Sequence, residues 1–157
     1  MANGSQQTAT PTPRGIRGAG LGPYKRQFAR RAQAVARARD FVVDLLAPGT
    51  DAGLADDIRV CVSELATNAL RHTPPGRDFL VRVLPRDGAL RIEVHDAGSG
   101  TPHLCTPAKT DDRGRGLRLV DALADDWGVS GRSGPGKAVW AEFKVVHPAA
   151  ADEDEPL

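Results

Sequence analysis

Cysteine is scarce in this chain of 157 residues: Cys61 and Cys105 stand far apart and form no CxxC pattern. This spacing excludes a clustered cysteine metal site and favours a reduced, cytoplasmic setting. Aromatic residues make up only 4% of the sequence and hydrophobic residues 40%. That amount of apolar surface is enough for one modest core, so the composition predicts a single domain and excludes a large multidomain machine.

Long apolar runs and an excess of charge of one sign are also missing. No run approaches the roughly 20 apolar residues that a membrane span requires, and the first 15 residues lack the apolar centre of a secretory signal. Basic residues number 21 and acidic residues 20, giving a net charge of +1. This balance does not favour direct binding to nucleic acid or to a membrane surface.

Both ends of the chain have the composition of flexible tails. Residues 1–22 are mostly small or polar, and residues 148–157 contain the acidic run Asp152–Glu155. Neither stretch has enough apolar surface to offset the entropy lost on ordering. We therefore expect residues 23–147 to form the folded domain, with the acidic tail most simply explained as a solvating segment.

Between the tails, helical and strand periodicities follow one another. Apolar residues recur at helical spacing over 31–47, 53–72 and 117–124. Alternation typical of strands occurs over 24–28, 79–83, 90–94, 127–130 and 138–146. This order predicts an α+β fold, with a mostly antiparallel sheet and helices on one face.

The second expected helix places two polar side chains at the edge of its apolar stripe. Glu64 and Asn68 are four residues apart, so they stack on one side of the helix. A carboxylate there can act as a general base, and an amide oxygen can bind Mg²⁺. The alternative, an ordinary exposed pair at a helix margin, stays open at this point.

Asp96 ends the strand over 90–94 and shares the inward parity of Leu90, Ile92 and Val94. An inward carboxylate can accept a hydrogen bond from an amino group such as that of adenine. Gly98 and Gly100 follow closely and let a ligand approach the backbone. An aspartate that only caps a turn would give the same local sequence.

Periodicity is absent from residues 97–116, a length that is typical of a lid or binding loop. At its end, Gly114 and Gly116 precede the helix that Leu117 opens, so free backbone N–H groups there could bind an anion. Arg113 and Arg115 could add charge to a phosphate site or simply face solvent.

Residues 131–138 nearly spell a phosphate-binding P-loop, but two features exclude one. Ala138 stands where the motif requires Ser or Thr, and a strand pattern follows where a helix is required. The four histidines show no metal-binding spacing. Residues 131–136 are therefore expected to form a turn.

Four segments, taken in order, resemble the GHKL ATP-binding superfamily, and more narrowly the stand-alone anti-sigma-factor serine/threonine kinases. They are ELATNALRH at 64–72, VHDAGSG at 94–100, GRGL at 114–117 and GKAVWAEF at 136–143. The stretch DALADDWGV at 121–129 also fits this subgroup. The resemblance covers residues 24–146 and leaves out both tails.

The resemblance implies a Bergerat-type two-layer sandwich, with a mixed, mostly antiparallel sheet and ATP held between the helices and a lid. It implies that Glu64 is the general base, Asn68 the Mg²⁺ ligand and Asp96 the adenine-reading residue. The further nucleotide-binding positions that it implies are Gly98, Gly100, Gly114, Gly116 and Leu117, and Arg115 is a candidate beside them.

The resemblance further implies a cytoplasmic regulator whose partners are a sigma factor and a single-domain anti-anti-sigma protein, and a possible homodimer. Family members often carry a Thr near Ala138 that helps to hold the adenine, and losing one hydrogen bond would cost about 1 kcal/mol. This substitution leaves open a non-catalytic ATP-binding module as the alternative. The catalytic domain of a two-component histidine kinase is disfavoured, because no long helix pair with a phosphoacceptor His is present.

Overall fold

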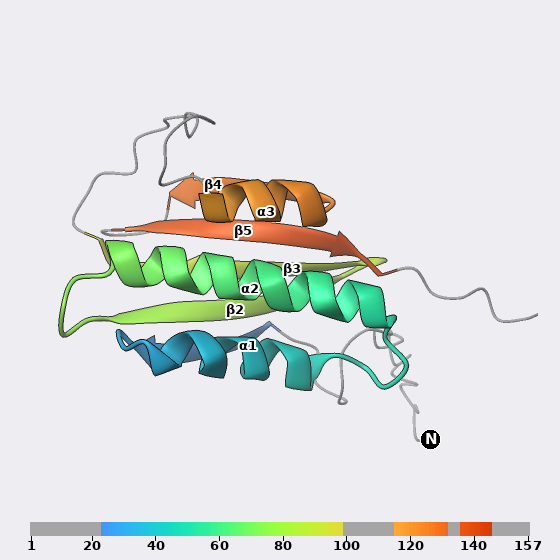
Figure 1. Cartoon of the computed structure of the whole chain (residues 1–157), viewed down its shortest axis with the longest axis horizontal. Coiled ribbons are helices and arrows are strands. Elements are labelled where there is room, and N and C mark those ends of the chain that lie inside the picture. Colours follow the sequence, from blue (N-terminus) through green and yellow to red (C-terminus); the bar gives the residue numbers. More distant parts are fainter. Residues whose placement is uncertain (1–22, 99–114, 132–135, 146–157) are drawn as a thin grey trace, which may run out of the picture.

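The computed structural model describes residues 23–98, 115–131 and 136–145, which form two layers (Figure 1). One layer is a five-stranded antiparallel sheet, and the other consists of three helices that cover one face of it. This arrangement confirms the α+β class predicted from the sequence. Both expected tails and most of the expected lid lie outside the described residues.

The elements agree with the sequence periodicity to within a few residues. In chain order they are β1 (Tyr24–Ala29), α1 (Gln33–Leu45), α2 (Ala52–His72), β2 (Asp78–Arg86), β3 (Ala89–His95), α3 (Arg115–Leu123), β4 (Asp126–Gly131) and β5 (Lys137–Lys144). Because a strand begins at Lys137, the near P-loop at 131–138 lacks the helix that a P-loop needs, as the sequence predicted.

The strand order in the sheet is β1-β2-β3-β5-β4, so β5 lies between β3 and β4. Each neighbouring pair among these strands is antiparallel, and the parallel pairing implied by a mixed sheet does not occur among them. In the β3–β5 register, Val94 stands opposite Val139 and His95 opposite Ala138. This register decides which side chains of β5 face the helices.

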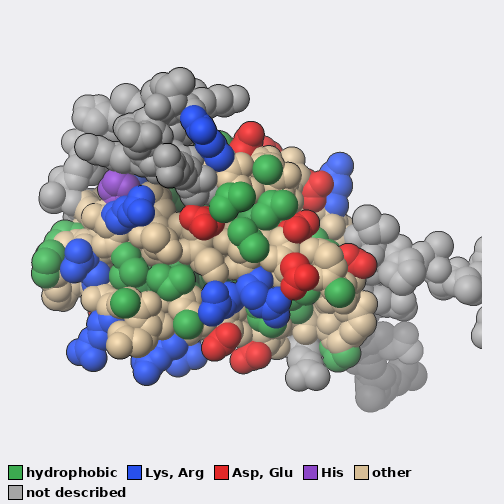
Figure 2. Space-filling view, in the orientation of Figure 1, with side chains coloured by type: hydrophobic (Ala, Val, Ile, Leu, Met, Phe, Trp, Pro, Cys, Tyr) green, Lys and Arg blue, Asp and Glu red, His purple; other side chains and the backbone are tan. Residues whose placement is uncertain are grey.

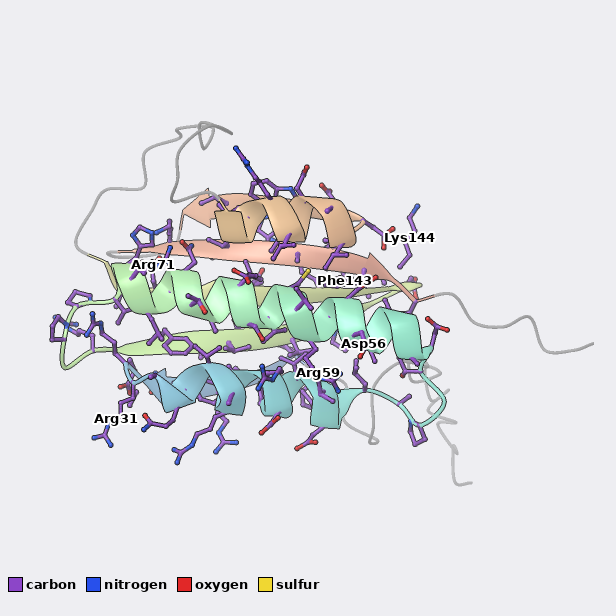
Figure 3. The ribbon with its side chains drawn as sticks, in the orientation of Figure 1. Arg31, Asp56, Arg59, Arg71, Phe143 and Lys144 are labelled. Carbon is purple, nitrogen blue, oxygen red and sulfur yellow. The ribbon has the colours of Figure 1, made fainter. Side chains whose placement is uncertain are left out.

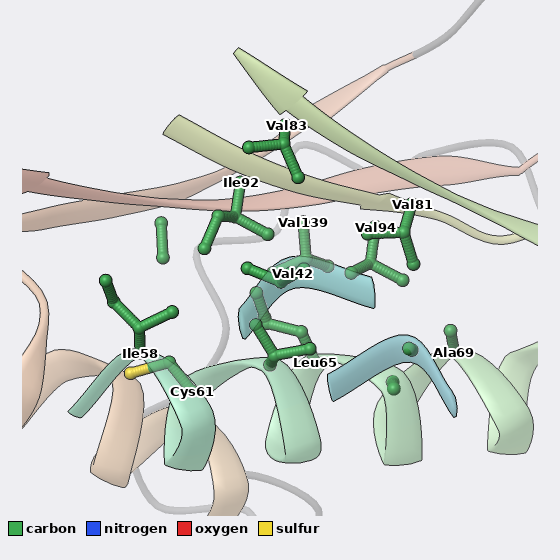
Figure 4. Packing of buried hydrophobic residues seen from close by; sticks show 14 of the residues in the cluster. Val42, Ile58, Cys61, Leu65, Ala69, Val81, Val83, Ile92, Val94 and Val139 are labelled. Carbon is green, nitrogen blue, oxygen red and sulfur yellow. The ribbon is translucent and has the colours of Figure 1, made fainter. Parts of the chain in front are cut away.

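Helix α2 lies in the middle of the helical layer, between α1 and α3 (Figure 1). The carboxylate of Asp51 caps its N-terminus by accepting the N–H of Leu54 at 2.9 Å, which satisfies one of the free donors of the first turn. Its apolar stripe packs on the sheet (Figure 4). The buried residues of this core include Ile58, Cys61, Leu65, Ala69, Val81, Ile92, Val94 and Val139. No helix in the described part of the chain is both long and apolar enough to cross a membrane.

The face of the sheet that carries no helix holds a network of charges around Glu93. This carboxylate is only 8% exposed, although it lies on the helix-free face. It accepts hydrogen bonds from Arg82 at 3.1 Å and Arg91 at 2.9 Å, and it is paired with His95 at 2.9 Å. Burial by itself raises the pKa of Glu93, but the hydrogen bonds from His95 and Arg91 outweigh burial and lower the pKa.

Candidate functional site

Asp96 follows β3 directly and is 2% exposed, which confirms that it faces inward. Its Oδ2 accepts a hydrogen bond from the Nζ of Lys137 at 2.8 Å. Its Oδ1 accepts one from the backbone N–H of Gly98 at 3.0 Å. Both interpretations of the sequence therefore hold in part: the carboxylate caps the turn at Gly98, and it also lies at the inner face of the sheet.

Glycines allow three backbone segments to meet around this carboxylate. A Cβ atom at Gly98 would lie 2.8 Å from the carbonyl oxygen of His72, the last residue of α2. Gly136 adopts φ +101°, and a Cβ atom there would overlap the carbonyl oxygen of Asp96. The backbone N–H of Asp96 also donates to the carbonyl oxygen of Lys137 at 3.0 Å. The end of β3, the start of β5 and the C-terminal end of α2 are thus held in contact.

Glu64 and Asn68 are half-buried and lie on the flank of α2 that faces α3. The opposite flank is fixed by Ser63, whose hydroxyl accepts a hydrogen bond from Arg39 of α1 at 3.3 Å. Because successive helical residues turn by about 100°, Glu64 and Asn68 point to the other side, where α3 packs (Figure 1). At about 1.5 Å per residue, Asn68 lies about 6 Å and Glu64 about 12 Å along the helix from His72.

Figure 3 gives the direction of this row along α2. Arg71 lies at the C-terminal end of the helix and Asp56 near the N-terminal end. The Asp96 turn belongs to the Arg71 end, because Gly98 packs against the carbonyl of His72. The row therefore begins at the Arg71 end with Asp96 and continues through Asn68 to Glu64. An acceptor for an amino group therefore lies at the C-terminal end of α2, and an amide oxygen and a second carboxylate follow along the helix.

The remaining predicted positions are described only in part. Leu117 is half-buried and packs against the core from α3. Arg115 and Gly116 form the first turn of that helix, so the helix begins two residues earlier than predicted. Gly100 and Gly114 lie outside the described residues, as does the expected lid between them. Their roles stay predictions.

The structure corrects the interpretation of Ala138. Side chains alternate along β5, and Val139, Ala141 and Phe143 lie in the core under the helices. Ala138 has the opposite parity and pairs with His95 on the helix-free face. Lys137 has the inward parity and contacts Asp96. An alanine at 138 therefore takes nothing away from the Asp96 side of the sheet, and the residue that contributes there is Lys137.

This placement of Lys137 could have been found in the sequence. The parity that runs backward from Phe143 through Ala141 and Val139 reaches Lys137 next, by the same reasoning that placed Asp96 inward. What the sequence does not contain is the register that brings the two residues together. That register depends on the pairing of β5 with β3, and it brings together Asp96 and Lys137, which are 41 residues apart in the chain.

A buried hydroxyl lies at the same end of α2. Thr73 follows the helix and is 2% exposed, and its Oγ1 has no hydrogen-bond partner within the described ranges. Buried polar atoms normally have partners. An unpaired hydroxyl one residue beyond His72 is expected if a further polar group, outside the described residues, completes the site.

The donor set is compatible with a nucleotide that is accompanied by Mg²⁺. Among the residues that the structure describes, no group of three or more His, Cys, Asp or Glu side chains could hold a metal ion. Mg²⁺ is commonly bound by one or two protein oxygens together with substrate phosphates. Asn68 could supply such an oxygen, and the chemistry of the site is compatible with ATP.

A separate groove of about 260 Å³ lies between β1 and α1, on the other flank of the helical layer. Arg26, Arg31 and Arg37 line it together with Phe28. Figure 2 shows basic side chains gathered on this side of the molecule. None of the predicted nucleotide-binding residues lines this groove, so it is distinct from the candidate site.

Comparison with known proteins identifies the family of the chain. The profile of the histidine kinase-like ATPase domain family matches residues 28–143. A protein of Streptomyces coelicolor described as uncharacterized is 41% identical over 85 residues, which cover 52% of this chain and 79% of that protein. The histidine kinase domain of a blue-light-activated histidine kinase from Erythrobacter litoralis is similar, with a TM-score of 0.48 and 27% identity.

The match to the Erythrobacter structure covers 70% of this chain but only 57% of that one, so this chain spans little more than half the length of that structure. The family match, by contrast, includes every described residue of the candidate site. The family assignment implies ATP binding, and the site described above supplies side chains suited to it. The chain belongs to the histidine kinase-like ATPase domain family.

Proposed function

We propose that the chain is an ATP-dependent serine/threonine protein kinase that phosphorylates an anti-anti-sigma protein and sequesters a sigma factor. The observation that carries the proposal is the buried Asp96 at the C-terminal end of α2, with Asn68 and Glu64 following along one flank of that helix. At the C-terminal end of the helix, Asp96 accepts a hydrogen bond from the 6-amino group of adenine. The triphosphate extends along the helix toward the other two side chains.

Asn68 and Glu64 have separate tasks in this proposal. Asn68 contributes an amide oxygen to the Mg²⁺ that accompanies the nucleotide, which neutralises charge on the phosphates. Glu64 accepts the proton of the attacking serine or threonine hydroxyl. The hydroxyl oxygen then bonds to the γ-phosphorus as the bond from that phosphorus to the leaving diphosphate breaks.

The regulatory partners are supported by the sequence resemblance over residues 24–146. The segments at 64–72, 94–100, 114–117 and 136–143 occur in the order found in anti-sigma-factor kinases. A cytoplasmic location, a sigma factor as the sequestered partner and a homodimeric state belong to the same proposal. The proposal includes no direct binding to nucleic acid, in keeping with the net charge of +1.

The proposal is tested by phosphoryl transfer from labelled Mg-ATP to a single-domain anti-anti-sigma protein. Glu64→Ala should lower the transfer rate by about 10²–10⁴-fold, the usual contribution of a general base, with little change in ATP affinity. Asp56→Ala on the same helix is the matched control, because Asp56 is exposed and its ion pair with Arg59 lies at the surface. Equal rates for the Glu64 variant and the parent would remove Glu64 from this role.

If nucleotide binds but no phosphate is transferred, the experiment favours the alternative, in which the chain is a non-catalytic ATP-binding module. The substitution that favoured this alternative was Ala138. Since Ala138 lies on the helix-free face, beside His95, it no longer favours the alternative over a kinase.

A further inference from the structure

We infer that Lys137 is a second base-reading residue, whose ammonium group donates a hydrogen bond to N1 of adenine while Asp96 accepts one from the 6-amino group. This inference rests on the proposed nucleotide binding and adds a residue that determines base specificity. It begins from the ion pair between Lys137 and Asp96, whose Nζ and Oδ2 are 2.8 Å apart.

The two partners of this ion pair are buried to different extents. The side chain of Asp96 is 3% exposed and that of Lys137 is 25% exposed. The carboxylate is therefore enclosed by protein, whereas the lysine reaches the pair from the solvent side. The part of this pair that solvent can reach is therefore the ammonium group.

The backbone fixes where this ammonium group can be. Lys137 is the first residue of β5, and its carbonyl oxygen accepts the N–H of Asp96 at 3.0 Å. Gly136, immediately before it, packs against the carbonyl of Asp96 so closely that no side chain fits. The backbone of Lys137 is thus fixed on both sides of its Cα, and the ion pair with Asp96 holds the Nζ end of its side chain.

The chemistry of the pair matches one edge of adenine. That edge presents an amino donor at N6 beside an acceptor at N1. The pair presents a carboxylate acceptor beside an ammonium group with three N–H donors, one of which is directed to Asp96. Two adjacent hydrogen bonds of opposite direction can therefore form, and both involve a charged protein group, which makes them stronger than neutral ones.

A purely structural ion pair is the competing explanation. Buried or half-buried ion pairs contribute little net stability, because desolvation offsets their attraction. Lys137 has the same parity as Val139 and Ala141, so an apolar residue would continue the core pattern of β5. A lysine is instead placed at the rim of the family's nucleotide site, where its charge meets the carboxylate that reads the base.

The test combines a protein variant with a nucleotide analogue. Binding of ATP and of 1-deaza-ATP, in which N1 is replaced by C–H, is measured by calorimetry on the full chain and on Lys137→Met. The parent should bind ATP about tenfold more tightly than the analogue, the effect of one hydrogen bond. In Lys137→Met this preference should fall to about one. Lys144→Met, at the other end of β5 (Figure 3), is the control and should keep the preference of the parent.

Each other outcome overturns the inference in a recognisable way. Equal binding of the two nucleotides by the parent removes the N1 contact without needing any variant to fold. An equal loss for both nucleotides in Lys137→Met means that the lysine only positions Asp96. Tighter ATP binding by that variant means that the lysine blocks the base, and tighter binding of GTP than ATP by the parent means that the pair reads guanine. If the parent binds no ATP, the proposed function fails as well.

Discussion

Cys61 lies at the centre of α2 and is fully buried in the core. Its burial, with a smaller contribution from the negative charges of Asp57 and Glu64, raises the pKa of the thiol to about 12. Because the thiolate is the reactive form, this thiol is protected both by enclosure and by protonation. It serves as a small apolar core residue.

The expected result is that Cys61 does not react in the folded protein. At pH 8 a thiol with this pKa is ionised in about one molecule in ten thousand. In a Cys105→Ser variant, iodoacetamide labelling followed by mass spectrometry should find almost no modified Cys61 until denaturant is added. Rapid labelling of this variant under native conditions would show that α2 opens locally or that the thiol is not enclosed.

The sequence predicts the direction of a side chain correctly where the alternation of a strand or the period of a helix is enough to fix it. Asp96 was placed inward, and Glu64 and Asn68 at the margin of the α2 stripe, and the structure confirms these positions. The same parity places Lys137 inward, whereas the family motif points to its neighbour Ala138, which lies on the helix-free face. The ion pair itself joins residues from two strands whose pairing no local pattern reveals.

At the scale of elements, β3, β4 and β5 are joined on the helix-free face by a stack around Trp140. The guanidinium of Arg91 on β3 lies 4.1 Å from the centre of the Trp140 ring. On the other neighbour, Gly128 of β4 stands opposite Trp140, and a Cβ atom there would lie 2.6 Å from the ring. The indole therefore packs over a position that only glycine leaves open.

Gly128→Ala should destabilise the protein by about 1–3 kcal/mol, because the indole must leave its place and the stack with Arg91 is lost. The measurement is the free energy of unfolding in urea. The double variant Gly128→Ala, Trp140→Ala supplies the control, since without the ring the added methyl group meets no obstacle. A similar penalty for Gly128→Ala with and without Trp140 would contradict this explanation.

Elements were predictable where the pattern is local. The stripes of α1 and α2 and the alternation of β2 and β3 predicted their existence and their buried faces. The insertion of β5 between β3 and β4 was not predicted, because strand order depends on contacts between distant segments. The same holds for the stack around Trp140, whose partners come from three strands.

At the scale of the whole molecule, the charge network around Glu93 links stability to pH. The pKa of Glu93 is lower in the folded protein than its ordinary value of 4.5. At a pH just below 4.5, Glu93 is therefore protonated more readily in the unfolded chain than in the folded protein. The stabilisation is therefore complete above about pH 5 and is lost as the pH falls through the folded-state pKa.

Glu93→Gln should weaken this dependence. The parent should lose stability between pH 5 and pH 3 more steeply than the variant, as followed by urea unfolding at a series of pH values. The variant is expected to be less stable than the parent at pH 7, because Arg82 and Arg91 lose a charged partner. Identical slopes for the two proteins would show that Glu93 titrates alike in the folded and unfolded states.

The central claim is that a buried carboxylate at the end of β3 reads the base of ATP. Calorimetric titration of Mg-ATP into the parent and into Asp96→Asn tests it most directly, with thermal unfolding of both proteins as the check on folding. Loss of a charge-assisted contact of about 2 kcal/mol predicts that the variant binds ATP about 30-fold more weakly. A folded Asp96→Asn variant that binds ATP as tightly as the parent would contradict the account.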